Sequence, residues 1–231
     1  FRSPSFHDSE ELGEGGKSFT SKGEDFDAAF YRKLIVDERA KAVLEKRHSK
    51  IVGIGECGLD FYRMPTEGER ERQMSAFRGQ IELALECDLP LMLHVRQAYG
   101  EVLDILTEYH NKLSQGHFKG WGIERLRGDC HFFAGTVDDA RGFLALGFYL
   151  SYTGVATFAK QYTQLIAATP ANRIMSETDC PYVAPVPERG KRNEPSFVIH
   201  IAHKIASIKG GDVAATQKQL VENAVELFNL K

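Results

Sequence analysis

The sequence predicts an α/β fold in which helices connect the strands of a parallel sheet. Short apolar or β-branched runs alternate along the chain with longer segments whose apolar residues have helical spacing. This alternation is typical of parallel sheets, either doubly wound or closed into a barrel. The 231 residues are enough for one α/β domain with a sizeable core. We count five strands, near residues 51, 91, 129, 149 and 174, whereas a closed barrel of this type has eight.

The chain before the first strand divides into two parts. Residues 1–25 are rich in Ser, Gly, Glu and Lys without a sustained period, so we predict an irregular N-terminal segment. Apolar residues recur at helical spacing over residues 27–46, which predicts a helix. Residues 26–231 are therefore expected to form the single folded domain.

The first strand leads to a glutamate between two glycines. Ile51, Val52 and Ile54 are apolar and β-branched, which is typical of a strand buried on both faces. The following run, Gly55–Gly58, contains Glu56, and its glycines permit tight turns. We therefore predict that Glu56 stands where the chain leaves the sheet, the edge at which ligands bind in such folds. An exposed loop glutamate is the alternative if Glu56 is considered alone.

The remaining elements follow from the same patterns. We predict helices over residues 67–87, 98–113, 138–146, 157–168, 196–208 and 212–230, and strands over 91–94, 128–131, 148–152 and 173–176. Pro90 marks the end of the 67–87 helix, because proline disfavours helical geometry in the preceding residue. A long proline-rich loop over 180–194 contains the basic run Arg189–Arg192.

Composition limits the compartment and the partners. A net charge of −3 and a pI near 6.3 argue against a general polyanion-coating surface, so nucleic-acid contact would need a local basic patch or a bound cation. No apolar run is long enough to cross a bilayer. The four cysteines form no CxxC pair, which favours free thiols in a reducing cytosol. We expect a cytoplasmic protein, with a nuclear location left open, no membrane association and no obligate protein partner.

Four of the five predicted strands end in a residue that can bind a divalent metal. These residues are Glu56, His94, His131 and Asp179. Because parallel strands bring their carboxyl ends to one rim, we expect the four side chains to converge although they are far apart in the sequence. Two imidazoles and two carboxylates suit zinc, manganese or iron.

Several stretches resemble the TatD family of metal-dependent deoxyribonucleases, which have an amidohydrolase-like TIM barrel. They are GIGECGLDFYR, LPLMLHVRQA, CHFFAGTVDDA, SETDCPYVAP and RGKRNEPSFVIHIAHKIASIKG, in that order, from about Lys50 onward. The resemblance implies a metal-dependent hydrolase that cleaves phosphodiester bonds of DNA with Mg²⁺, Mn²⁺ or Zn²⁺. It implies metal-ligand roles for all four residues above. Catalytic roles fall to Glu56, which binds or bridges the metals, and to Asp179, which orients the attacking water and accepts its proton.

The sequence departs from the family pattern at its start. Family members open with a strand that ends in a His-x-His pair, whereas His7 and His48 are isolated here. The resemblance therefore implies an incomplete (β/α) barrel whose first three strands are missing, and we expect truncation to be the reason. One metal position would lack its main ligands. We accordingly expect the chain to bind at most one divalent ion well and to hydrolyse DNA weakly or not at all.

Two arginines are predicted to hold substrate phosphates. Arg96 follows His94 by two residues, and Arg192 lies in the basic run together with Lys191. Solvated loop charges are the alternative for both. Glu177 is expected to be a buried structural carboxylate, and Asn193 to secure the 180–194 loop.

Two other functions stay open at this point. One is a hydrolase that uses the same metal site on an amide or carboxylic ester. The other is a truncated, non-catalytic relative that binds nucleic acid or a protein through the barrel rim.

Overall fold

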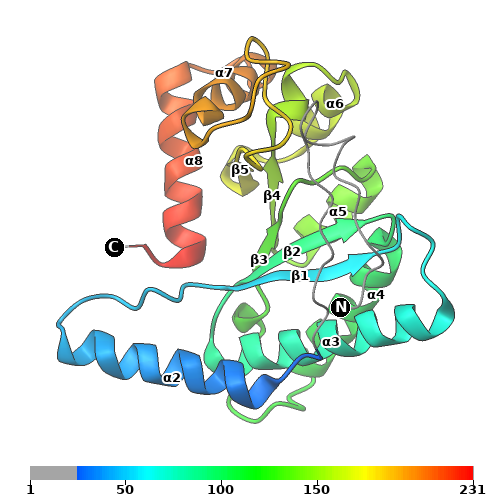
Figure 1. The fold of residues 1–231 in the computed structure, drawn as a ribbon, viewed down its shortest axis with the longest axis vertical. Coiled ribbons are helices and arrows are strands. Elements are labelled where there is room, and N and C mark those ends of the chain that lie inside the picture. The colour runs from blue at the N-terminus through cyan, green and yellow to red at the C-terminus, as the bar shows by residue number, and fades with distance from the viewer. Residues whose placement is uncertain (1–24, 231) are drawn as a thin grey trace. The chain divides into compact units, whose positions relative to one another are not determined.

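The computed structural model describes residues 25–230 and confirms the α/β class. Five strands form one sheet, in the order β1-β2-β3-β4-β5 (Figure 1). The predicted irregular segment over residues 1–25 lies outside the described residues, apart from Asp25, and so does His7. The helices are α2 (Ala28–Leu44), α3 (Glu67–Cys87), α4 (Tyr99–Ser114), α5 (Val137–Ala145), α6 (Gln161–Ala168), α7 (Val198–Lys209) and α8 (Val213–Phe228). The strands are β1 (Ile54–Asp60), β2 (Leu91–Arg96), β3 (Gly128–Cys130), β4 (Tyr149–Tyr152) and β5 (Ile174–Ser176).

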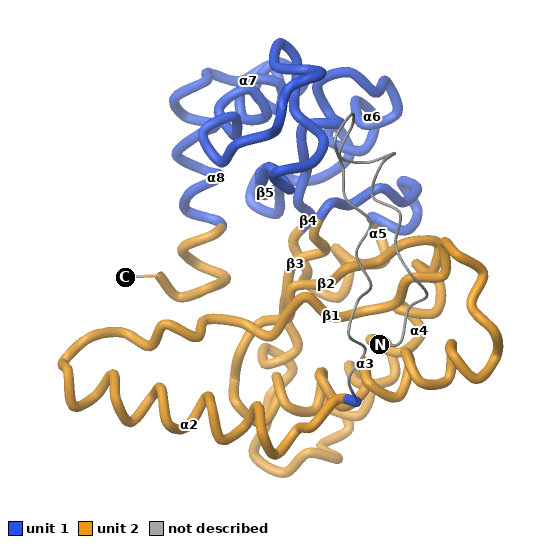
Figure 2. The backbone as a smooth tube through the Cα atoms, in the orientation of Figure 1, with its two compact units in different colours: residues 1–25, 132–140, 150–223 blue, residues 26–131, 141–149, 224–231 orange. Residues whose placement is uncertain are grey.

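The chain divides into two compact units, coloured separately in Figure 2. Of the described residues, unit 2 comprises 26–131, 141–149 and 224–230. Unit 1 comprises residues 132–140 and 150–223 together with Asp25.

Unit 2 is built on the parallel strands β1, β2 and β3. Gly58 lies opposite His94, and Leu93 lies opposite Cys130. Helix α3 packs against β1, α4 packs against β1 and β2, and α2 packs on α3. The inward residues of α3 include Phe77 and Ile81, both fully buried, as its helical periodicity predicted.

Strand β2 buries only one of its faces, whereas the sequence predicted a buried strand. Leu91, Leu93 and Val95 are buried. His94 and Arg96 alternate with them and are partly exposed, together with Met92. Since successive side chains of a strand point to opposite faces, His94 and Arg96 share one face. That partly exposed face carries the polar groups described below.

The first strand begins later than predicted. It starts at Ile54 rather than Ile51 and runs through Glu56 to Asp60, with an irregular register between Ile54 and Cys57. Glu56 therefore lies inside the strand, at the irregularity, and not beyond its end.

The predicted burial of the first strand on both faces is also wrong. Ile51, Val52 and Ile54 are only partly buried. They line an open, largely apolar groove of about 390 Å³ together with Met92 and Phe228. The reason is the position of β1 at the end of the strand order, so that one of its edges has no strand beside it among residues 25–230.

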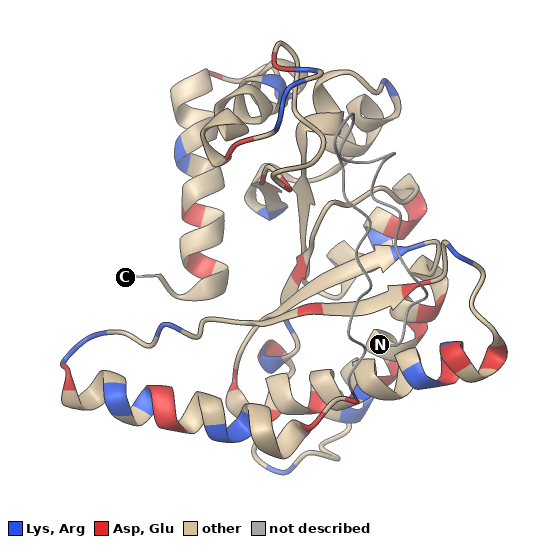
Figure 3. Ribbon diagram, in the orientation of Figure 1, with Lys and Arg blue, Asp and Glu red and all other residues tan. Residues whose placement is uncertain are grey.

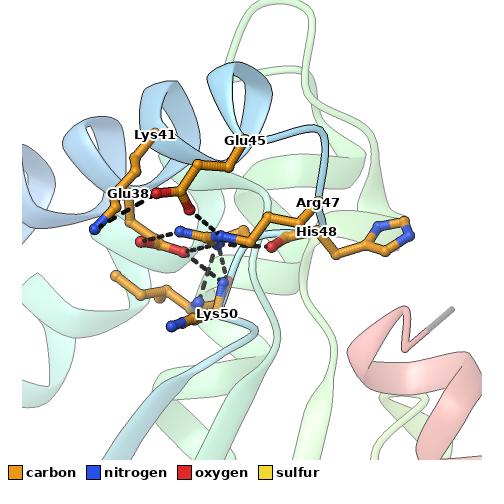
Figure 4. Close-up of polar contacts among 8 residues, drawn as sticks. Glu38, Lys41, Glu45, Arg47, His48 and Lys50 are labelled. Atoms are coloured by element: carbon orange, nitrogen blue, oxygen red, sulfur yellow. Dashed lines mark hydrogen bonds and ion pairs between the residues drawn. The ribbon is translucent and has the colours of Figure 1, made fainter.

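An ion-pair cluster fixes the connection between α2 and β1 (Figure 4). Arg47 Nη1 lies 2.5 Å from Glu38 Oε1, and Arg47 Nε lies 2.6 Å from Glu45 Oε2. Arg47 Nη1 also donates to the carbonyl oxygen of His48 at 2.9 Å. The backbone N–H of Lys50 donates to Glu38 Oε1 at 2.7 Å. We call this set the Arg47 cluster; it ties the last turns of α2 to the chain that enters β1.

Unit 1 contains β4 and β5, which pair in parallel with Leu150 opposite Ile174. Helix α6 begins at Gln161, four residues later than predicted, because Gly154–Thr157 forms a 3₁₀ helix. The hydroxyl of Thr157 accepts a hydrogen bond from the backbone N–H of Val186 at 2.8 Å. That contact holds Thr157 to the proline-rich loop instead of to α6.

The same loop is secured by Asn193, as predicted. Its side chain is buried and donates to the carbonyl oxygens of Thr178 at 2.7 Å and of Tyr182 at 2.5 Å. A buried amide with both donors satisfied fixes the loop without exposing unpaired polar atoms. Among residues 25–230, the helices lack the combined length and apolar character that crossing a bilayer requires.

Candidate metal centre

Glu56, His94 and His131 come together in unit 2, from three successive strands. His94 Nδ1 lies 3.0 Å and His131 Nε2 lies 2.9 Å from the same oxygen, Glu56 Oε1. One potential ligand atom from each of the three residues lies within 4.8 Å of the other two. The two imidazole rings have centroids 6.0 Å apart. We call these three residues the Glu56 triad.

The strands hold the triad in place through backbone geometry. His94 is the fourth residue of β2, on its partly exposed face. His131 directly follows β3, and its backbone N–H donates to the carbonyl oxygen of Leu93 at 3.0 Å. The His131 side chain is 12% exposed, against 38% for His94 and 48% for Glu56. The triad is thus most enclosed at the His131 imidazole and most exposed to solvent at the Glu56 carboxylate.

The two histidines act on the ionisation of Glu56. Hydrogen bonds from His131 first and from His94 second hold the pKa of Glu56 far below its ordinary value, although burial of the carboxyl opposes them. The carboxylate is therefore charged over the whole physiological range of pH. A permanently charged oxygen is the form in which a carboxylate binds a cation.

His94 also contacts a second carboxylate, Asp60, which the sequence interpretation missed. His94 Nε2 lies 3.3 Å from Asp60 Oδ2. Burial alone would lower the pKa of His94, but the hydrogen bonds to Asp60 and Glu56 outweigh it and raise the pKa to about 9. Burial would raise the pKa of Asp60, but the hydrogen bonds from His94 and from the backbone N–H of Tyr62 lower it. Both ring nitrogens of His94 therefore face carboxylate oxygens in the metal-free protein.

A signal for Asp60 was present in the sequence. Asp60 is the last residue of β1, and the carboxyl ends of parallel strands are the edge at which ligands are expected. It also stands at an even spacing from Glu56 and Gly58, the spacing that places strand residues on one face. Placing the strand three residues too early hid this relation.

Of the remaining predicted site residues, Arg96 ends β2 in unit 2, whereas Asp179 and Arg192 belong to unit 1. Asp179 is partly buried and adopts a left-handed backbone conformation, φ 54°, which Asp tolerates better than most residues. Arg192 is exposed in the proline-rich loop. Glu177 Oε1 accepts a hydrogen bond from the backbone N–H of Phe132 at 2.7 Å, which agrees with the predicted structural role of Glu177.

The Glu56 triad fits a divalent metal ion. One carboxylate and two imidazoles are a donor set that zinc and manganese accept, and their atoms already converge without a metal. Asp60 would act behind His94, since metal-binding histidines commonly give their second ring nitrogen to a carboxylate. The triad and Asp60 together therefore have the chemistry of a metal centre with an orienting partner.

Comparison with known families agrees with this chemistry. A model of the family described as "TatD related DNase" matches residues 27–229. The chain belongs to this family. Its likeness to TatD proteins thus extends upstream of Lys50 and includes α2.

Two relatives and one solved structure show how far the TatD likeness reaches. The "Uncharacterized metal-dependent hydrolase YabD" of Bacillus subtilis (strain 168) is 38% identical over 185 residues, which cover 79% of this chain and 67% of YabD. The "3'-5' ssDNA/RNA exonuclease TatD" of Erwinia billingiae (strain Eb661) is 35% identical over 189 residues, which cover 78% of this chain and 67% of that protein. The chain spans about two thirds of the length of these relatives. Together they support a metal-dependent hydrolase of the TatD family.

The structural likeness supports the predicted fold. The crystal structure of YJJV, a TatD homolog from Escherichia coli k12, aligns with a TM-score of 0.73 at 23% sequence identity, covering 91% of this chain and 73% of YJJV. Residues 25–230 contain a sheet of five strands, the number counted from the sequence. The prediction of an α/β fold of the TIM-barrel type is therefore confirmed.

Proposed function

We propose that this TatD-family chain hydrolyses phosphodiester bonds of DNA with a divalent metal ion held by the Glu56 triad. The convergence of Glu56, His94 and His131 within 4.8 Å carries the proposal, because it supplies a cation site in a chain of the TatD related DNase family. The name of the Erwinia relative, an ssDNA/RNA exonuclease, supports phosphodiesters as the substrate class. Mg²⁺, Mn²⁺ and Zn²⁺ are the proposed cofactors, and the cytoplasm is the proposed location.

Each residue of the centre has a separate task in this proposal. Glu56 supplies the charged oxygen, and His94 and His131 supply neutral ring nitrogens. These three residues would hold a divalent ion, which would supply polarisation of phosphoryl oxygens and activation of water at neutral pH. Asp60 positions His94 through the 3.3 Å contact with its other ring nitrogen.

Asp179 is proposed to orient the attacking water and to accept its proton. The role comes from the resemblance of its ETD-x-PY stretch to the family pattern. Glu177, two residues earlier, accepts a hydrogen bond from the backbone N–H of Phe132 and is given no part in the proposed chemistry.

Arg96 and Arg192 are proposed to hold substrate phosphates. Arg96 lies on the same face of β2 as His94, two residues further along the strand. Guanidinium groups bind phosphate oxygens in a bidentate manner, which fixes a phosphodiester relative to the ion. Acidic and basic residues are mixed along α2 and α3 (Figure 3), so substrate contact would depend on such local groups.

The test combines ion titration with substrate hydrolysis. Calorimetry with Mn²⁺ and hydrolysis of a 5′-labelled single-stranded DNA are measured on the wild-type chain, on Glu56→Gln and on Glu38→Gln. Glu38→Gln is the matched control, since it removes the same charge from the Arg47 cluster. A panel of amide and carboxylic ester substrates is run beside the DNA.

We expect the wild-type chain to bind one ion and to cleave the DNA slowly with Mn²⁺. Glu56→Gln should lose both the ion binding and the cleavage, whereas Glu38→Gln should keep both. Cleavage of an amide or ester but not of DNA would replace the proposal by the amidohydrolase alternative. Failure to cleave any substrate with Mn²⁺ present, or equal cleavage by wild-type and Glu56→Gln, would refute it.

A further inference from the structure

An exposed tyrosine lies beside the Glu56 triad and is connected to it through Asp60. Tyr62 follows β1 by two residues, and 47% of it is exposed. Its backbone N–H donates to Asp60 Oδ1 at 2.9 Å, while Asp60 Oδ2 contacts His94. One carboxylate therefore fixes both the tyrosine backbone and the triad histidine.

The ring of Tyr62 is held from one side by Arg96. The guanidinium carbon of Arg96 lies 3.6 Å from the centroid of the Tyr62 ring. Arg96 lies opposite Asp60 in the strand register, and its carbonyl oxygen accepts a hydrogen bond from the backbone N–H of Phe61 at 2.8 Å. Both members of the Tyr62–Arg96 pair are thus fixed at the carboxyl ends of paired strands. The ring is oriented before any ligand arrives.

The Tyr62–Arg96 pair is placed so that it could contact both the base and the phosphate of a nucleotide. Arg96 and His94 share one face of β2, separated by two strand residues or about 7 Å. A stacked guanidinium keeps its N–H donors in its own plane, where they can still reach a phosphate. An aromatic face beside such donors suits a base attached to the phosphate that the donors hold.

We propose that the Tyr62–Arg96 pair is a stacking platform for one nucleobase of the substrate. The proposal rests on the proposed function, because it assumes that the Glu56 triad acts on a nucleic-acid phosphodiester. Aromatic side chains stack on any base, so the platform confers a preference for nucleotides with a base over those without one. Arg96 stabilises the ring by a cation–π contact and directs its donors toward the phosphate.

The experiment compares two fluorescein-labelled oligonucleotides of equal length, oligo-dT and a chain of abasic tetrahydrofuran sites. Binding is followed by fluorescence anisotropy in EDTA, so that the result does not depend on turnover. The proteins are the full chain, Tyr62→Leu, Tyr62→Ser, Tyr62→Phe and the control Phe30→Leu. Phe30 is an aromatic residue of α2 that is 54% exposed. Far-UV circular dichroism checks that each variant is folded.

We expect the wild-type chain to bind oligo-dT about tenfold more tightly than the abasic chain. Tyr62→Leu and Tyr62→Ser should lose this preference and leave abasic binding unchanged, whereas Tyr62→Phe and Phe30→Leu should retain it. Equal binding of the two oligonucleotides by the wild-type chain, no binding of either, or a preference that survives in folded Tyr62→Leu or Tyr62→Ser would overturn the proposal. DNA cleavage by a chain without this preference would leave the proposed function intact and remove only the platform.

Discussion

The Arg47 cluster and the Glu56 triad of unit 2 each place one carboxylate beside two nitrogen groups, and they differ in what those nitrogens can do. In the Arg47 cluster, Glu38 accepts from the guanidinium of Arg47 and the backbone N–H of Lys50 (Figure 4). In the Glu56 triad, Glu56 meets the imidazoles of His94 and His131. A guanidinium or a backbone N–H has no lone pair to offer a cation, whereas a neutral imidazole does.

The difference teaches that a perturbed pKa does not by itself locate a functional site. The pKa of Glu38 is lowered to about 2, chiefly by the hydrogen bond from Arg47, and the pKa of Glu56 is also far below its ordinary value. Both carboxylates are stabilised in their charged form. Only Glu56 lies beside imidazoles, which can release a proton and bind a metal ion in its place.

The largest expected difference between the clusters is in ion affinity. Glu56→Gln removes the charged ligand and should weaken Mn²⁺ binding by more than about 100-fold, since even partners behind the ligands contribute 10- to 100-fold. Glu38→Gln should leave Mn²⁺ binding unchanged. Isothermal titration calorimetry of both variants at one pH measures the contrast. Similar losses in the two variants would abolish the distinction drawn here.

The next effect concerns protons at the triad. Because the pKa of His94 is raised to about 9 in the metal-free protein, the ion must displace a proton from His94 at neutral pH. The apparent affinity for Mn²⁺ should therefore fall by about tenfold for each unit of pH below 8. Calorimetry at pH 8, 7 and 6 in buffers of different ionisation enthalpy measures both the affinity and the proton release. A pH-independent affinity with no proton released would show that His94 is not displaced.

A third effect isolates Asp60 from the triad. Asp60→Asn removes one of the two carboxylates that raise the pKa of His94, so this pKa should fall back toward its ordinary value. The exposed Asp37→Asn, which removes a surface ion pair with Lys33, is the control and should leave the pKa of His94 unchanged. Titration of the imidazole by NMR in EDTA gives the result directly. If the pKa of His94 is unchanged in Asp60→Asn, Glu56 alone keeps this pKa raised.

The smallest effect is on stability at the Arg47 cluster. The folded-state pKa of Glu38, about 2, lies below its ordinary value of 4.5, so its contribution is present above pH 4.5 and is lost as the pH falls toward 2. Glu38→Gln should lower the urea midpoint at pH 6 and have little effect near pH 2.5. If Glu38→Gln lowers the urea midpoint by the same amount at pH 6 and at pH 2.5, the charge of Glu38 does not stabilise the fold.

Local periodicity predicted most elements because it depends on neighbours in the sequence. Helix α3 has the bounds expected from its apolar stripe, and β2 to β5 lie where the short apolar runs stand. The first strand was misplaced because its beginning, Ile51–Gly53, has the composition of a buried strand but lies at the end of the sheet. Long-range strand order, which composition does not encode, decides whether such residues pair.

In the candidate site, too, some features follow from local sequence patterns and others depend on how the strands pair. Residue type and strand position predicted that Glu56, His94, His131 and Asp179 would meet, and the structure brings the first three together in unit 2. The contact of Asp60 with His94 was missed because the strand was placed from Ile51 onward, whereas β1 continues to Asp60, which pairs opposite Arg96. The roles of Asp179, Arg96 and Arg192 stay predictions.

The most direct test of the central claim is an anomalous difference map from a crystal of the chain grown with Zn²⁺. The account predicts a peak bonded to Glu56 and to one ring nitrogen each of His94 and His131, with no peak in the Arg47 cluster. A triad that keeps its direct Glu56–His hydrogen bonds, with no anomalous peak between them at saturating Zn²⁺, would contradict it.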